Sequence, residues 1–127
     1  MLAALFALVV LAAGAALVWA RLSRPRPPLG WTHVGEPPPG ADEALDALRT
    51  LCPGMRFGGT IEWVTEPWPL PYGQGLAAGQ VLDFARHRIR LLGLAWLPHE
   101  IGHLYLRSAA ESEALREWTE RARAAIG

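Results

Sequence analysis

The chain has 127 residues, with 12 basic and 12 acidic side chains, so its formal net charge is zero. This length allows one small domain and little more, and the neutral balance indicates neither a nucleic-acid surface nor a strongly acidic partner. The single cysteine, Cys52, excludes an internal disulfide and a cysteine-based metal cluster, and we expect it to be a small buried side chain.

The N-terminal segment, residues 1–20, contains no charged side chain and consists mainly of Ala, Leu and Val. Its length is that of a membrane-spanning helix, and Trp19 would lie at the interface. Because Arg21, Arg24 and Arg26 follow this stretch and no basic residue precedes it, the positive-inside rule places the rest of the chain in the cytoplasm. A cleaved signal peptide is the alternative, but such peptides carry positive charge before the apolar stretch, which favours an uncleaved anchor.

Proline-rich sequence follows the predicted anchor. Residues 21–40 predict a stiff, extended linker that holds the domain away from the bilayer. We expect His33, within this linker, to be solvated. The folded domain is then predicted to occupy residues 41–127.

Hydrophobic periodicity predicts the elements of that domain. Helical spacing predicts a helix over Asp42–Leu51, and alternation predicts a strand over Thr60–Thr65. Glu66–Gly75 is a loop rich in proline, glycine and aromatic residues. Gln80–Phe84 and Arg88–Leu92 are predicted to form a hairpin with a tight turn. Its arginines either favour acidic substrate segments or form a solvated strand face; they are Arg86, Arg88 and Arg90.

The motif His-Glu-Ile-Gly-His, residues 99–103, lies in an apolar run that predicts a buried helix. Residues four apart share one helix face, so His99 and His103 can bind the same metal ion, and Glu100 can accept a proton from a zinc-bound water. Burying these groups unpaired would cost several kcal/mol, which favours metal binding over two surface histidines. Gly102 indicates that another backbone or a substrate approaches closely.

A catalytic zinc site keeps three protein ligands, so a third ligand is required. Ser108 is a candidate N-cap for the last helix, with Glu111 as its capping-box partner. Glu111 would then face the histidines from the first helical turn, or it would only complement the helix dipole. If Glu111 points away, Glu113 and Asp83 are the remaining candidates.

The segment from Leu97 to Leu104, followed by Glu-Ser-Glu-Ala at residues 111–114, resembles the zincin metallopeptidases of the gluzincin kind. It is closest to small bacterial ImmA/IrrE-type proteins and more loosely similar to HtpX-like membrane proteases. The resemblance covers roughly residues 77–118. It implies that Glu111 is the third zinc ligand and that the edge strand of a small sheet binds substrate in extended form. In many relatives an Asp or Asn follows the alanine and supports the site, whereas this chain has Leu115.

Together these features predict an α+β fold: an N-terminal transmembrane helix, then a minimal zincin-like domain. That domain would comprise a helix, a small antiparallel sheet, the HExxH helix and a C-terminal helix. The predicted function is a membrane-anchored metallopeptidase that cleaves peptide or protein substrates. Its residues would be Glu100 as the base and His99, His103 and Glu111 as ligands of Zn²⁺.

Two residues are candidates to stabilise the oxyanion, Tyr72 in the loop and His87 in the hairpin turn, whereas Tyr105 is expected to serve packing. Two other classes of protein remain open. The first is a metal-binding pseudoenzyme that acts as a regulator or adaptor at the membrane. The second is a structural module without metal, in which the motif is accidental.

The charge asymmetry around residues 1–20 generates a topology prediction. A reporter fused after Gly127 should be active only if it is of the kind that works in the cytoplasm, because the basic residues follow the span. Paired cytoplasmic and periplasmic reporters measure this. Activity of a periplasm-only reporter, or a mature N-terminus at Arg21, would contradict the prediction.

Overall fold

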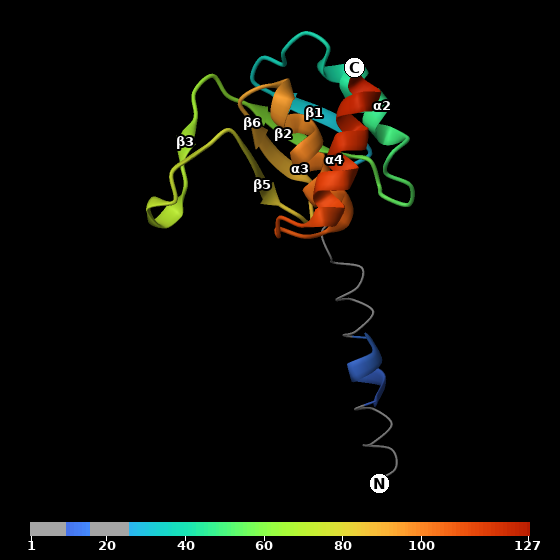
Figure 1. Cartoon of the computed structure of the whole chain (residues 1–127). Coiled ribbons are helices and arrows are strands. Elements are labelled where there is room, and N and C mark those ends of the chain that lie inside the picture. Colours follow the sequence, from blue (N-terminus) through green and yellow to red (C-terminus); the bar gives the residue numbers. More distant parts are fainter. Residues whose placement is uncertain (1–9, 16–25) are drawn as a thin grey trace, which may run out of the picture.

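The computed structural model of the chain describes residues 10–15 and 26–127 (Figure 1). Within these two ranges, no helix is both long enough and apolar enough to cross a membrane. The predicted anchor lies for the most part outside the described residues, as do Arg21 and Arg24. The anchor and its topology therefore stay predictions.

The domain is mixed α+β, as predicted, and its main sheet has the strand order β1-β2-β6-β5. The strands are β1 (Gly30–Val34), β2 (Gly58–Trp63), β5 (Gly79–Asp83) and β6 (Arg88–Leu91). The predicted hairpin is confirmed, since β5 pairs antiparallel with β6. The expectation of a purely antiparallel sheet is wrong, because β1 and β6 both run parallel to β2.

Strand β1 lies inside the segment 21–40 that was expected to be a linker. It pairs with β2 along its whole length, so the ordered sheet begins at Gly30 and not after residue 40. His33 is not simply solvated, because its Nδ1 accepts a hydrogen bond from Trp63 Nε1 at 2.9 Å. Its Nε2 lies 2.9 Å from Asp42 Oδ1, which links β1 to the first helix of the domain.

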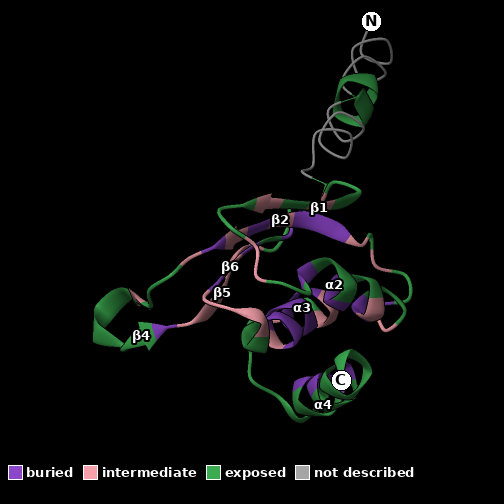
Figure 2. Ribbon diagram, turned by 90° about the horizontal axis from the view of Figure 1, so that it is seen from above, coloured by how far each residue is buried: buried purple, intermediate pink, exposed green. Residues whose placement is uncertain are grey.

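Three helices cover one face of the sheet, as Figure 2 shows. They are α2 (Ala41–Arg49), α3 (Leu97–Leu106) and α4 (Glu113–Ile126). The short 3₁₀ turn η2 (Leu94–Trp96) leads directly into α3. Fully buried aliphatic side chains from β2, β6 and the helices form one core. The predicted helices and strands of residues 41–127 are thus present with small shifts of their ends.

One hydrogen bond and one buried side chain just after α2 belong to this core. Trp118 of α4 donates a hydrogen bond from Nε1 to the Leu51 carbonyl at 3.0 Å. Cys52 is 3% exposed, and burial raises the pKa of its thiol to about 12. Cys52 is therefore an inert core side chain, as the sequence predicted.

Residues 68–77 form an arm that projects from the body of the domain (Figures 1 and 2). The arm contains β3 (Trp68–Pro69), the 3₁₀ turn η1 (Pro71–Gly73) and β4 (Leu76–Ala77), and β3 pairs antiparallel with β4. The sequence had predicted only a loop here. Trp68 fixes the base of the arm, because its Nε1 donates to Gln80 Oε1 at 2.8 Å and Arg90 lies 5.4 Å from its ring centre.

Gly102 marks the closest approach between α3 and α4. A Cβ at this position would lie 2.7 Å from Leu115 Cδ1 and 2.9 Å from Trp118 Cε3. The sequence predicts that a backbone or a substrate approaches here, whereas the structure shows side chains of α4 in that place. An alanine here would force the two helices apart.

We predict that Gly102→Ala lowers the free energy of unfolding by about 1–3 kcal/mol, because overpacking outweighs the gain in helix propensity. Denaturant unfolding of the purified full chain measures this. Gly93→Ala is the matched control, since a Cβ at Gly93 meets nothing within 4 Å. A Gly102→Ala variant as stable as the wild type would contradict the packing argument.

Candidate metal centre

Helix α3 carries the two histidines on one face, one turn apart. Pro98 occupies the start of the helix, where its missing N–H costs nothing. His103 is 6% exposed and His99 is half-buried. The two Nε2 atoms lie 3.2 Å apart, so both imidazoles aim at the same point.

The way α3 ends determines which nitrogen of His103 carries a proton. Arg107 adopts the left-handed conformation with φ 53°, and the N–H of Ser108 donates to the His103 carbonyl at 3.2 Å. This is a Schellman termination with arginine in the position usually taken by glycine, at a cost of about 1–2 kcal/mol. The reversal turns the Ser108 carbonyl back towards the helix, where it accepts a hydrogen bond from His103 Nδ1 at 2.6 Å.

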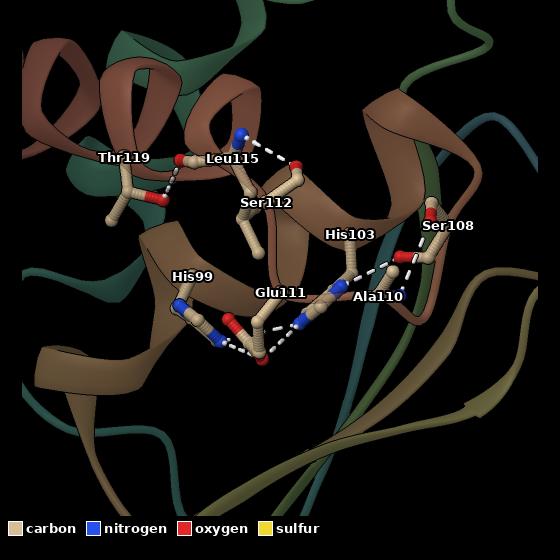
Figure 3. A network of polar contacts seen from close by, with 8 residues as sticks. All are labelled: His99, His103, Ser108, Ala110, Glu111, Ser112, Leu115 and Thr119. Carbon is tan, nitrogen blue, oxygen red and sulfur yellow. Dashed lines mark hydrogen bonds and ion pairs between the residues drawn. The ribbon is translucent and has the colours of Figure 1, made fainter.

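The α3–α4 loop then delivers Glu111 to the histidines. Figure 3 shows its carboxylate between the two imidazoles, with Oε1 at 3.1 Å from each Nε2. The predicted cap at Ser108 is wrong: its hydroxyl accepts from the Ala110 N–H, and Ser112 caps α4 by accepting from the Leu115 N–H at 3.1 Å. Glu111 consequently lies just before the helix and not in its first turn.

Three ligand atoms thus form a nearly equilateral triangle with sides of 3.1, 3.1 and 3.2 Å. A tetrahedral zinc site with bonds of about 2.0–2.1 Å separates its ligand atoms by about 3.3 Å, so the spacing fits such an ion. Two imidazole nitrogens and one carboxylate oxygen are also a ligand set that zinc accepts. The remaining tetrahedral position would stay open.

The tautomer of His103 strengthens this fit. Since Nδ1–H donates to the Ser108 carbonyl, the neutral ring has a bare lone pair at Nε2. That lone pair faces the carboxylate oxygen of Glu111 at 3.1 Å, so a cation can bind between the two atoms when the ring is neutral, whereas a protonated ring would donate to Glu111 as an ion pair. Histidines that bind metals hold their second ring nitrogen in this way.

Glu100 lies beside the triangle and is 4% exposed. His99, Glu100 and His103 each offer a ligand atom within 4.8 Å of the others, so Glu100 is also within reach of an ion shared with the histidines. The 3.1 Å contacts of Glu111 Oε1 with both Nε2 atoms favour Glu111 as the ligand and leave Glu100 as the proton acceptor. Burial raises the pKa of Glu100 to about 7, and the nearby Glu111 carboxylate adds to the rise, while His103 opposes it. Gly79 of β5 makes room for this side chain, since a Cβ there would lie 3.1 Å from Glu100 Oε1.

A cleft of about 420 Å³ opens beside Glu100. Its walls are the arm, β5, α3 and the α3–α4 loop, and they include Leu70, Gly79, Val81, Phe84, His103 and Glu111. A second, smaller hollow lies between α3 and α4, where His99 and Glu111 meet Arg116. The candidate metal centre therefore lies at the rim of two hollows.

The other sequence candidates lie elsewhere. Tyr72 is 96% exposed at the tip of the arm, and the Nδ1 of His87 is hydrogen-bonded to the Gly58 carbonyl in a separate hollow. Glu113 pairs with Arg116, and Asp83 accepts from the Arg86 N–H. Tyr105 packs with its ring centre 5.9 Å from that of Trp118, as expected.

Comparison with known proteins adds no relative. No family model matches the chain, and neither a curated protein nor a solved structure does. The geometry of the site therefore carries the functional argument alone.

The buried carboxyl of Glu100 generates a pH prediction for the metal-free chain. Its pKa rises from 4.5 to about 7 on folding, so the folded chain holds this proton more tightly than the unfolded chain. The resulting stability is present below pH 4.5 and is lost as the pH rises to about 7, by at most about 3 kcal/mol. The Glu100→Gln variant should not lose stability in this way as the pH rises, because it has no carboxyl at this position.

Denaturant unfolding with a chelator, between pH 4.5 and 8, measures the effect. Glu117→Gln changes an exposed glutamate of α4 and should follow the wild type. Equal pH slopes for wild type and Glu100→Gln would contradict the prediction.

Proposed function

We propose that this chain is a membrane-anchored, zinc-dependent metallopeptidase with a minimal zincin-like domain on the cytoplasmic side. The observation that carries the proposal is the triangle formed by Nε2 of His99, Nε2 of His103 and Oε1 of Glu111. The buried Glu100 beside that triangle supports a hydrolytic role.

His99, His103 and Glu111 would hold the zinc ion. When bound there, zinc lowers the pKa of water to about 7 and polarises a carbonyl oxygen. Glu100 accepts a proton from the attacking water as the new C–O bond forms. It then donates that proton to the leaving amine as the C–N bond breaks. A zinc ion held beside Glu100 would lower the pKa of this carboxyl from its metal-free value, so that Glu100 would be ionised and able to accept the proton.

Strand β5 supports binding of an extended substrate, because it is an edge strand and borders the cleft. Leu92 N–H donates to the Ala78 carbonyl, and hydrogen-bonded residues alternate along an antiparallel pair. Gln80 therefore directs its backbone groups to β6, whereas Gly79 and Val81 direct theirs to the free edge. A peptide strand could form backbone hydrogen bonds with Gly79 and Val81. The peptide bond beside its paired residues would then lie over Glu100.

We predict one zinc ion per chain. His99→Ala or Glu111→Ala should lower the zinc content towards zero and should remove the stabilisation that zinc gives against heat. Elemental analysis and thermal unfolding, each with and without a chelator, measure this. Glu117→Ala, on an exposed position of α4, is the matched control and should keep full zinc content. Unchanged zinc content in His99→Ala would contradict the assignment.

We predict that Glu100→Gln retains zinc but cleaves about 10²–10⁴-fold more slowly, because it lacks the base. Cleavage of an unfolded casein-like substrate by the full-length protein, with and without a chelator, measures the difference. If the zinc-loaded wild type cleaves no faster than Glu100→Gln, the chain is a metal-binding pseudoenzyme, and the role would be that of a regulator or adaptor.

A further inference from the structure

The arm, residues 68–77, forms one wall of the cleft although it lies apart from the core in Figure 1. Leu70 and Gln74 of the arm line the cleft opposite Glu100 and His103. The Leu70 N–H donates to the Gly75 carbonyl at 2.9 Å, which closes the turn and fixes where Leu70 lies. The arm therefore contributes one apolar side chain to the cleft that Glu100 and His103 also line.

The base of the arm is attached to the outer face of the sheet. Trp68 donates a hydrogen bond to the side chain of Gln80. In β5, Gln80 lies between Gly79 and Val81, whose backbone groups face the free edge of the sheet. Arg90 lies over the Trp68 ring and also donates to Glu62 Oε2 at 3.1 Å. The arm and the edge strand thus form one connected frame around the cleft.

The chemical character of the lining is apolar and acidic. Leu70, Val81 and Phe84 supply apolar surface, and Phe84 is 39% exposed. The charged groups are Glu100 and Glu111, and among residues 26–127 no arginine lines this cleft. The apolar part of this lining favours an apolar substrate side chain.

The arginines of the hairpin do not alter this preference. Arg88 and Arg90 both pair with Glu62 on the outer face of the sheet, where the hydrogen bond from Arg88 lowers the pKa of the Glu62 carboxyl. Glu62 neutralises one of these two charges. Arg86, Arg88 and Arg90 are all absent from the residues that line the cleft, so they place no positive charge in it.

We infer that the arm is the substrate-selecting wall of the cleft, and that Leu70, with Val81 and Phe84, selects an extended peptide segment bearing an apolar side chain next to the scissile bond. This inference rests on the proposed function, because it takes the cleft to be the peptide site. Leu70 is the specificity-determining residue on the arm. Leu76 lies on the same arm, is 68% exposed and does not line the cleft, so it provides a matched control.

The test uses full-length Glu100→Gln, loaded with zinc in detergent, and a fluorescent glycine–serine peptide with one central leucine. Companion peptides carry aspartate or serine at that position. Fluorescence anisotropy should show the leucine peptide binding at least about tenfold more tightly than the uncharged serine peptide, as expected for burial of one aliphatic side chain. Adding Leu70→Ser should weaken leucine-peptide binding about tenfold at unchanged zinc content, and adding Leu76→Ser should not.

Equal affinity for the three peptides, or an equal loss in Leu70→Ser and Leu76→Ser, overturns the inference. A second experiment incubates wild-type protein with the same peptides and detects cleavage products by mass spectrometry. It distinguishes failure of this inference from failure of the proposed function. Cleavage without preference for leucine overturns the inference alone. Selective binding without any cleavage by wild type overturns the peptidase proposal and leaves the selective cleft in place.

Discussion

The hydrogen bond from His103 Nδ1 to the Ser108 carbonyl, 2.6 Å long, is the contact on which the candidate metal centre depends. It exists because α3 ends with Arg107 in the left-handed conformation, which turns the next carbonyl back over the last helical turn. The same reversal starts the short loop that brings Glu111 to both imidazoles. One backbone turn thus fixes the tautomer of one ligand and the position of another. The strain of a non-glycine residue in this conformation lies next to the site that it shapes.

Much of the site could be predicted because it depends on local periodicity. The spacing of His99 and His103 sets their shared direction on any helix, and Glu100 follows from the same geometry. The close approach at Gly102 could also be predicted, since a glycine within a buried helix is costly unless something packs against it. The α+β class and the β5–β6 hairpin followed from apolar alternation and turn residues.

The features that could not be predicted from the sequence depend on contacts between residues that are far apart along the chain. Strand β1 was missed because prolines surround it and its pairing with β2 joins residues far apart in sequence. The cap of α4 was assigned to Ser108 because Glu111 completes a capping box there, whereas the end of α3 already uses the Ser108 N–H and carbonyl. The arm gave no periodic signal, since its strands have two residues each, and Trp68 fixes it through Gln80. The hydrogen bond between His103 and the Ser108 carbonyl left no signal in the sequence either, because a backbone carbonyl is present at every residue.

The most direct test of the central claim observes the imidazole nitrogens themselves. Full-length protein with ¹⁵N-labelled histidine is titrated with zinc, and long-range proton–nitrogen NMR assigns the proton of each ring. Substitution of each histidine in turn assigns the signals. The account predicts that His103 carries its proton on Nδ1 and that its Nε2 shifts on saturation with one equivalent of zinc. A proton on Nε2 of His103 in the zinc-saturated protein, or no change at Nε2, would contradict it.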